Sequence, residues 1–446
     1  EIWFLNRVHV STEMSLAYKI LKKYYNNLKI FGYKSGNKVN GWEIPEGWDV
    51  VKGFLKDSKG KIITDWSKNK LSLWTYSPSF KGRISKKELL KKIIFDKKKP
   101  TSTLFHFRNQ YNSHDRNWGF SLPYNKVKSL KDKNYNVDIE TKFFQGKLEM
   151  AEQIHHGSIK ECILLVGHFD HPQMCLDGLI GCLAGHEVLT RLKKIKTRYT
   201  YRMLSTVEII GSVFYAKHFA KKNNIKEALF LATSGAPEKI HYQNSFAGNN
   251  LVDNASNHCL KFFEKNSKSS KFRKGPLGND EIAFDVGGID IPCGSIMRAP
   301  FKTYHTDKDN PSAVSNKHFE EMVDFILQII FILENNYYIK RNFSGLPKLS
   351  SKVNNLYLQP PTVSGLPHKN QTEMYASLYE GLDKKSLSYV KKNTHKWNYL
   401  MNSIPNLCNG DRSILDIAEF TDLPFKFVFN YLELWKKAGL IKKIWR

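Results

Sequence analysis

The spacing of hydrophobic and polar positions changes several times along the chain. Between about residues 137 and 336, short apolar runs alternate with stretches in which apolar residues recur every three to four positions. Uninterrupted apolar runs indicate strands buried on both faces, and the longer period indicates helices packed on them. This alternation predicts an α/β domain with a mainly parallel central sheet. The predicted strands are 162–167, 201–207, 228–233 and 291–297. One predicted helix begins at residue 178, and three more cover 211–222, 251–265 and 315–336.

The segments on either side have other patterns. Residues 12–27 have an amphipathic helical pattern, and residues 34–130 form short β-like runs separated by turns, which predicts a compact β-rich domain. Residues 337–375 contain Pro, Ser and Gly and are interpreted as a connector. The tail shows helix, turn, helix and a short β run, typical of a winged helix-turn-helix. The predicted domains are an N-terminal helix (1–33), a β-rich inserted domain (34–130), the α/β domain (131–345) and a winged-helix domain (375–446).

Composition excludes some classes of protein. With 446 residues, 41% hydrophobic and 13% aromatic, the chain is long enough for several domains with real cores and is not disordered. No apolar stretch approaches the ~20 residues that span a bilayer, and the opening "EIWFLNRVHV" lacks the layout of a signal peptide. The six cysteines contain no CxxC pair, as expected of buried free thiols. We therefore expect a cytoplasmic protein without a membrane partner.

The formal net charge of +27 is a feature of many nucleic-acid-binding proteins. However, 57 of the 69 basic residues are lysines spread from end to end, which is typical of a solvated surface. The second predicted tail helix, 424–439, carries Phe and Trp rather than the Arg, Asn and Gln that read bases. We therefore expect no nucleic-acid partner. The tail is interpreted as a packing element that, like the inserted domain, could join copies of the chain into a homo-oligomer.

Candidate chemistry begins directly after the strand predicted over 162–167. The segment "GHFDHPQMCLDGLIG" (167–181) places His168 and Asp177 at the carboxyl end of that strand, where α/β proteins form their active sites. His and Asp are zinc ligands, and Asp170 could orient a ligand through a hydrogen bond. A polar loop is the alternative when this segment is taken alone.

Later strand ends carry the same kinds of residue. In so lysine-rich a chain, random loops would more often carry Lys, Ser or Asn. The repeated delivery of histidines and carboxylates to one rim therefore favours a metal site. These residues are Glu208 after the strand 201–207, Asp280 and Glu281 before the strand 291–297, and His305 after it.

Four segments occur in a fixed order: "GHFDHP…LDGLIG", "YRMLSTVEIIGS", "GNDEIAFDVGGIDIPCGSIMR" and "YHTDKDN". They resemble the zinc aminopeptidase, transferrin-receptor and glutaminyl-cyclase superfamily. With "GNKVNGWEIPEGWDV", "NWGFSLPYN" and the tail, the chain is more closely similar to a bacterial aminopeptidase-like branch with an inserted N-terminal domain and a C-terminal winged helix. The resemblance implies a three-layer α/β/α zinc-peptidase-like domain with a mainly parallel sheet.

The resemblance also implies roles for individual residues. His168, Asp177 and His305 would bind metal, and Asp177 corresponds to the aspartate shared between the metals of two-zinc members. Glu208 falls where the superfamily has two glutamates, one a general base and one a ligand. We interpret Glu208 as the base, with metal ligation as the alternative.

The chain departs from the two-zinc members at one position. Those members carry a further ligand Asp where this chain has Ala232 and Thr233. We therefore expect one firmly bound zinc ion, and a second ion would have to recruit Asp280. The segment "VDNASN" (252–257) is closer to the superfamily's Asp-Asn-Ala-Ser signature than "LDGLIG" is. Because it opens a predicted helix far from any His-x-Asp segment, we interpret it as a capping sequence.

Three functions are compatible with these observations. The first is a zinc-dependent, aminopeptidase-like amide hydrolase acting on a small peptide or amide substrate. The second is a zinc hydrolase acting on a non-peptide amide such as an N-acylated sugar, and the third is a degenerate peptidase homologue with a regulatory winged helix. In the enzymes, Asp280, Glu281 and Arg298 would position the substrate, although an internal salt bridge is an equal alternative for Arg298. His171 either lines the substrate pocket or has no role in it.

Overall fold

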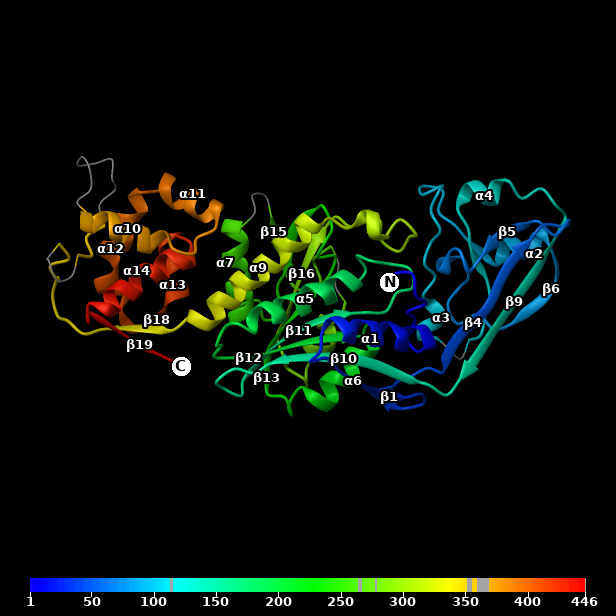
Figure 1. Cartoon of the computed structure of the whole chain (residues 1–446), viewed down its shortest axis with the longest axis horizontal. Helices are drawn as coiled ribbons and strands as arrows, with labels where there is room; N and C mark the ends of the chain where they lie inside the picture. Colours follow the sequence, from blue (N-terminus) through cyan, green and yellow to red (C-terminus); the bar gives the residue numbers. More distant parts are fainter. Residues whose placement is uncertain (113–114, 264–266, 277–278, 351–354, 359–368, 446) are drawn as a thin grey trace. The chain divides into compact units, whose positions relative to one another are not determined.

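The computed structural model describes residues 1–112, 115–263, 267–276, 279–350, 355–358 and 369–445. Its chain forms two compact units. Unit 1 comprises Glu1–Gly248 and Ser270–Val323, and unit 2 comprises Asn249–Ser269 and Asp324–Arg446. Figure 1 shows the order of the helices and strands along the chain.

Unit 1 is built on a mixed β-sheet whose central strands are parallel. The strand order is β1-β10-β12-β11-β13-β16-β14, and an eighth strand, β15 (Lys268–Ser270), spans the division between the units. β11 pairs in parallel with β12 and β13, and β13 pairs in parallel with β16. β10 and β14 run antiparallel to their inner neighbours, and β1 runs antiparallel to β10. The bounds are β1 Lys29–Lys34, β10 Lys147–His155, β11 Cys162–His168, β12 Thr200–Thr206, β13 Ile225–Leu231, β14 Lys239–Gln243 and β16 Cys293–Ala299.

Helices pack on this sheet, as the alternating pattern predicts. α5 (Leu179–Leu192) contacts the four strands from β10 to β13, and α8 (Glu281–Phe284) contacts β13 and β16. α6 (Ile210–Phe219) packs on α8, and α1 (Thr12–Tyr24) packs on β10. Every residue of β11 is buried, as expected of a central strand covered on both faces. The predicted α/β class with a mainly parallel sheet is therefore confirmed.

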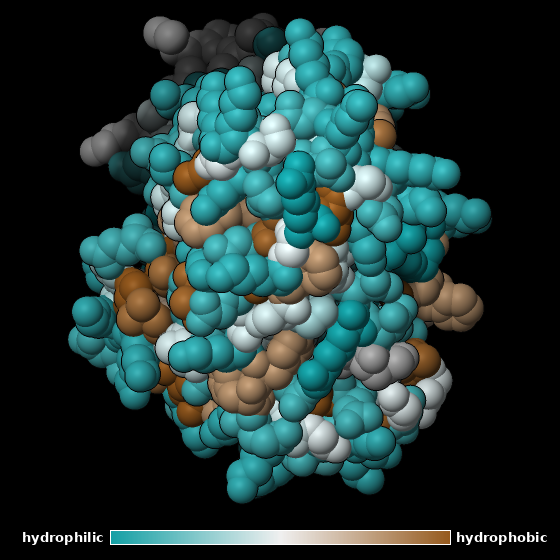
Figure 2. All heavy atoms as spheres, turned by 90° about the vertical axis from the view of Figure 1, so that its right-hand side faces the viewer, coloured by the Kyte–Doolittle hydropathy of each residue, from teal (hydrophilic) through white to brown (hydrophobic). Residues whose placement is uncertain are grey.

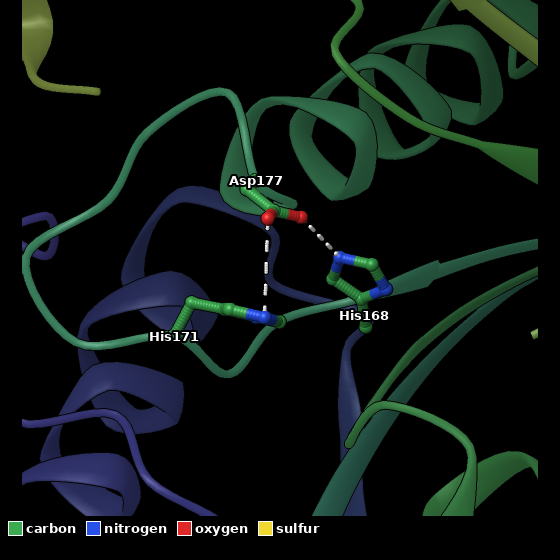
Figure 3. Close-up of side chains that lie close together, drawn as sticks. All are labelled: His168, His171 and Asp177. Atoms are coloured by element: carbon green, nitrogen blue, oxygen red, sulfur yellow. Dashed lines mark hydrogen bonds and ion pairs between the residues drawn. The ribbon is translucent and has the colours of Figure 1, made fainter. Parts of the chain in front are cut away.

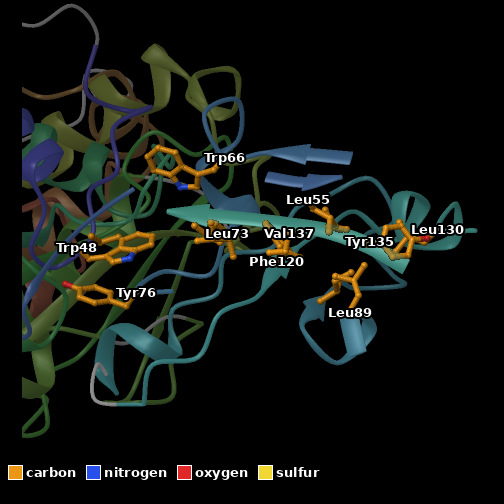
Figure 4. Packing of buried hydrophobic residues seen from close by; sticks show 14 residues of the cluster. Trp48, Leu55, Trp66, Leu73, Tyr76, Leu89, Phe120, Leu130, Tyr135 and Val137 are labelled. Carbon is orange, nitrogen blue, oxygen red and sulfur yellow. The ribbon is translucent and has the colours of Figure 1, made fainter. Parts of the chain in front are cut away.

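A second sheet in unit 1 has the order β5-β4-β9-β6. A hydrophobic cluster that includes Trp48, Leu55, Tyr135 and Val137 forms its core (Figure 4). This sheet supports the β-rich pattern predicted over 34–130, while the boundary of a separate domain stays a prediction. The bounds are β4 Gly47–Lys56, β5 Ile62–Asp65, β6 Phe80–Ser85 and β9 Asn134–Phe144, with β2 Lys38–Val39, β3 Trp42–Glu43, β7 Ile93–Ile94, β8 Phe120–Ser121, α2 Lys86–Lys91, α3 Arg108–Tyr111 and α4 Tyr124–Lys128 in the same region.

Unit 2 combines helices with a three-stranded sheet of order β18-β17-β19. The connector interpreted over 337–375 is partly wrong, because β17 lies within it and α10 begins within it. Part of it, 359–368, lies outside the described residues. The winged helix stays a prediction. α9 (Asn316–Asn335) crosses the division between the units. The other bounds are α7 Leu251–Phe263, β17 Tyr338–Arg341, α10 Lys369–Tyr379, α11 Lys384–Lys392, α12 His395–Leu407, β18 Asn409–Ser413, α13 Ile414–Thr421, α14 Phe425–Lys437 and β19 Ile441–Ile444.

One face of the molecule is consistent with the lysine-rich composition. The face turned toward the viewer in Figure 2 is mostly hydrophilic, with hydrophobic residues in small separate groups. Such a pattern is typical of a solvated surface. Across the described part of the chain, none of the helices combines the length and the apolar character that a membrane span requires. The cytoplasmic location and the homo-oligomer stay predictions.

Candidate metal centre

The candidate site lies in unit 1, where two parallel neighbouring strands end. β11 ends at His168, and β12 ends at Thr206, two residues before Glu208. The loop that follows β11 reaches Asp177 just before α5 begins at Leu179. Because the carboxyl ends of parallel strands meet at the same edge of a sheet, these side chains share one rim.

Asp177 is the centre of the site (Figure 3). Its Oδ1 lies 2.9 Å from Nε2 of His168, and its Oδ2 lies 3.1 Å from Nε2 of His305 and 3.9 Å from Nε2 of His171. Gly178 allows the close approach, because a Cβ there would lie 2.2 Å from Cδ2 of His168. The structure thus brings together the three residues expected to bind metal, His168, Asp177 and His305, and adds His171 to them.

The rings of His168 and His171 are each fixed by a hydrogen bond from Nδ1, the ring nitrogen that does not face Asp177. Nδ1 of His168 donates to Oδ2 of Asp280 at 3.0 Å, and Nδ1 of His171 donates to the backbone carbonyl of Asp170 at 2.7 Å. Nε2 of His171 is buried and has no hydrogen-bond partner among the described residues, and it lies 3.9 Å from Oδ2 of Asp177, which is paired with His305. Unpartnered buried polar atoms are rare, and a divalent cation beside Asp177 would satisfy this nitrogen. The residues present therefore fit a metal ion.

His168 is held by Asp280, and the expectation that Asp170 orients a ligand stays a prediction. The carboxylate of Asp170 accepts the backbone N–H of Glu208 at 2.8 Å. Asp280 is fixed in turn by the backbone N–H of Ile209, which donates to its Oδ1 at 2.9 Å. Both aspartates are fully buried, so each positions part of the site rather than meeting solvent.

Glu208 faces the same site. Its Oε2 accepts a hydrogen bond from the Tyr111 hydroxyl at 2.5 Å and lies 3.7 Å from Nε2 of His171, and its Oε1 accepts one from the Asn279 amide. Burial opposes ionisation, but the neighbouring His171 and His168 lower the pKa of Glu208 below its ordinary value. Glu208 is therefore an ionised carboxylate at the rim.

Neighbouring opposite charges also shift the pKa values of His168 and Asp177. Burial disfavours a charge on either His168 or Asp177. Nevertheless, Asp177 and Asp280 raise the pKa of His168 well above its ordinary value, and His171, His168 and His305 lower the pKa of Asp177 well below its own. The carboxylates therefore stabilise a positive charge at this place, which is what a metal ion would bring.

Two buried side chains hold the loop between β11 and α5. Arg7 binds the first half of the loop through backbone carbonyls, and Asp309 binds the second half through backbone N–H groups. Together they set the position of Asp177 without touching its side chain. The contacts are Arg7 to the carbonyls of Phe169 (2.9 Å) and Met174 (2.7 Å), the His171 N–H to the carbonyl of Arg7 (2.8 Å), and the N–H groups of Cys175 (3.2 Å), Leu176 (2.7 Å) and Asp177 (2.9 Å) to Asp309.

Comparison with known proteins gives this architecture a family. The family model described as "Domain of unknown function (DUF4910)" matches residues 1–336. The chain belongs to the DUF4910 family. A relative of this DUF4910 chain in Clostridium acetobutylicum, a "Putative polysaccharide biosynthesis protein with aminopeptidase-like domain", is 30% identical over 329 residues, which are 73% of this chain and 74% of the relative.

Solved structures show the same fold. A "putative peptidase" from Clostridium acetobutylicum aligns with a TM-score of 0.79 and 24% identity over 99% of the DUF4910 chain and 94% of that protein. BSAP, a zinc aminopeptidase from Bacillus subtilis, aligns with a TM-score of 0.53 and 14% identity over 73% of this chain and 90% of its own. A peptidase M28 precursor from Shewanella amazonensis aligns with a TM-score of 0.51 and 12% identity over 78% of this chain and 93% of its own. The predicted zinc-peptidase-like fold is confirmed.

Two predicted site residues of the DUF4910 chain have partners elsewhere. The carboxylate of Glu281, next to Asp280, accepts hydrogen bonds from Gln243 and Arg273 at 3.1 Å each. The buried guanidinium of Arg298 donates to Glu321 at 3.1 Å and to the carbonyl of Glu238 at 2.7 Å. The structure therefore brings Asp280 but not Glu281 to the metal ligands, and gives Arg298 the internal salt bridge that was its alternative.

Aromatic residues from the β-rich region also reach the site of the DUF4910 chain. Tyr111, which the sequence left between lining the site and packing in a core, donates a hydrogen bond to Glu208. The ring of Phe105 lies 5.2 Å from that of His171 and 5.4 Å from that of His305, and the ring of Phe107 lies 5.2 Å from His305. Their sequence signal was weak, because an aromatic residue in a β-rich segment is usually part of a core.

Proposed function

We propose that the protein is a metal-dependent amide hydrolase with zinc as its ion, held by His168, Asp177 and His305. The observation that carries the proposal is the convergence of these three side chains and Glu208 on one rim of the aminopeptidase-like fold. When bound, zinc supplies Lewis acidity toward a carbonyl oxygen and lowers the pKa of water.

The protein's own groups supply the proton transfers and the orientation. Glu208 is ionised and lies beside the ligands, so it can take a proton from the attacking water and return it to the leaving amine. The Tyr111 hydroxyl donates to one oxygen of the Glu208 carboxylate, and the Asn279 amide donates to the other. The carboxylate therefore keeps the same orientation during both proton transfers. Phe105 and Phe107 bring apolar surface to this side of the site and reduce its access to water.

One ion per chain follows from the ligands at hand. Ala232 and Thr233 follow β13, where two-zinc members of the superfamily carry a ligand Asp, and neither side chain can replace a carboxylate. Asp280, which would be needed for a second ion, is already bonded to His168 and to the Ile209 N–H. The site is therefore proposed to hold a single ion.

A second candidate substrate is a non-peptide amide such as an N-acylated sugar. Two observations favour it: the missing carboxylate distinguishes the chain from two-zinc aminopeptidases, and the name of the Clostridium acetobutylicum relative refers to polysaccharide biosynthesis. The reaction and the roles of the residues would be the same as for a peptide.

The test begins with the purified full chain loaded with zinc. Hydrolysis of amino-acid arylamides and of N-acylated sugars is measured side by side, with Glu208→Gln as the control for contaminating enzymes. Turnover of either class by the wild type but not by the variant supports the proposal and identifies the substrate class. A chain that binds zinc but hydrolyses neither class would contradict the enzymatic function.

A further inference from the structure

We infer that His171 is a fourth protein ligand of the metal, bound through Nε2. This inference rests on the proposed function, because it concerns the ion of the same site. It replaces the two earlier interpretations of His171, as a residue that lines the substrate pocket or as one without a role there.

The first argument is the state of the ring. Nδ1 donates to the carbonyl of Asp170 at 2.7 Å, so the proton of a neutral ring is on Nδ1 and the lone pair is on Nε2. That nitrogen is buried in a residue that is 1% exposed, and no described residue offers it a hydrogen bond. Leaving a buried polar atom without a partner destabilises the folded chain, so a role for His171 that leaves Nε2 empty is unfavourable.

The second argument is spacing. Nε2 of His171 lies 3.9 Å from Oδ2 of Asp177 and 3.7 Å from Oε2 of Glu208, which is too far for a hydrogen bond to either carboxylate. Zinc binds nitrogen and oxygen at about 2.0–2.2 Å, so two ligand atoms on one ion are roughly 3.3 Å apart in tetrahedral geometry. The separations around Asp177 lie close to that value, and ligand-capable atoms of His168, His171 and Asp177 all lie within 4.8 Å of one another.

The third argument is that the backbone forces the ring into this place. His171 has a φ of 96°, in the left-handed region that a non-glycine residue seldom adopts. Its N–H is fixed by the carbonyl of Arg7 at 2.8 Å. Strain of this kind persists where the surrounding structure over-determines it, and it concentrates at functional sites.

His171 would therefore compensate for the carboxylate missing after β13. A neutral imidazole replaces an anionic ligand, so the set becomes three histidines and Asp177. Such a set carries one negative charge, which suits a single divalent ion with Glu208 left as the base.

The experiment measures zinc affinity by competition with a chromophoric chelator for the wild type, His171→Gln and a control, His186→Gln. His186 is also buried, but both of its ring nitrogens have partners, Gln153 and Ser205. We expect His171→Gln to weaken zinc binding by more than the ~10–100-fold that is typical of residues one contact away from a metal. The control should keep wild-type affinity. Wild-type affinity in His171→Gln would overturn the inference.

X-ray absorption spectroscopy of the zinc-loaded wild type tests the same point without any substitution. Three imidazole ligands are expected, and two would contradict the assignment even if His171→Gln fails to fold. A wild-type chain that binds no zinc would instead defeat the proposed function, so the two failures are distinguishable.

Discussion

Two short acidic segments of the chain look alike and do different things. "LDGLIG" contains Asp177 in unit 1, and "VDNASN" contains Asp253 in unit 2. Asp177 lies in a loop after a buried parallel strand and meets three histidines. Asp253 lies in the first turn of α7 and bonds to Asn250, whose side chain both accepts from the Asp253 N–H (3.0 Å) and donates to its carboxylate (2.6 Å).

The difference shows that the role of an aspartate depends on the side chains that other strand ends bring into contact with it. The residues next to it in the sequence do not determine this role. Asp253 resembles the superfamily signature more closely, yet its partner is a helix-capping residue. The expectation of a capping role holds with one change: the cap is Asn250, three residues before Asp253, and not Asp253 itself.

The largest effect should come from substituting the two aspartates in parallel. Asp177→Ala removes the proposed metal ligand that lies beside all three histidines. Zinc affinity should therefore fall by well over ~100-fold, and amide hydrolysis should disappear. Asp253→Ala should leave zinc content and hydrolysis unchanged. Elemental analysis of both dialysed variants checks this, and equal zinc in the two would remove the distinction between the segments.

Glu208→Gln should separate catalysis from binding. Loss of the general base should reduce kcat about 10²–10⁴-fold, while zinc affinity stays within the range of the wild type. If zinc affinity fell together with kcat, Glu208 would be a ligand, which was its alternative interpretation.

Asp309→Ala should test the loop that carries Asp177. It leaves three buried N–H groups without their acceptor, so we expect zinc binding to weaken about 10–100-fold. Asp307→Ala is the matched control in the same segment, because Asp307 contacts Thr103 and Asn69 rather than the metal loop. Chelator competition compares them, and equal affinities would show that the loop holds its position without Asp309.

The smallest effect should come from the cap of α7. Asn250→Ala should lower the free energy of unfolding by about 1 kcal/mol, within the range for lost helix caps, and leave zinc affinity unchanged. Thermal unfolding followed by circular dichroism measures the first quantity. A change in zinc affinity would mean that the segment is not merely structural.

Much of this could be predicted from the sequence because strand ends are local signals. The apolar run 162–167 and the residues after it made His168 and Asp177 candidates. Glu208 and His305 at later strand ends favoured a metal site, and the family resemblance supplied the roles of these residues. β10 and β14, the antiparallel strands on either side of the parallel strands, were missed because they mix polar and apolar residues and lack the uninterrupted pattern of β11.

Contacts between distant residues could not be predicted. Arg7 binds a carbonyl 162 residues away, and backbone carbonyls carry no signal in a sequence. The contact of Asp280 with His168 depends on the direction of two side chains that lie 112 residues apart, which composition does not contain. The same holds for the adjacent Asp280, which precedes α8, and Glu281, its first residue, because their side chains bond to different partners, His168 and Arg273.

Metal analysis of the purified chain tests the central claim most directly. The full-length wild type, loaded with zinc and dialysed, should retain one zinc ion per chain, and Asp177→Ala should retain essentially none. Absence of zinc from the wild type, or equal zinc in the variant, would contradict a metal centre built on Asp177.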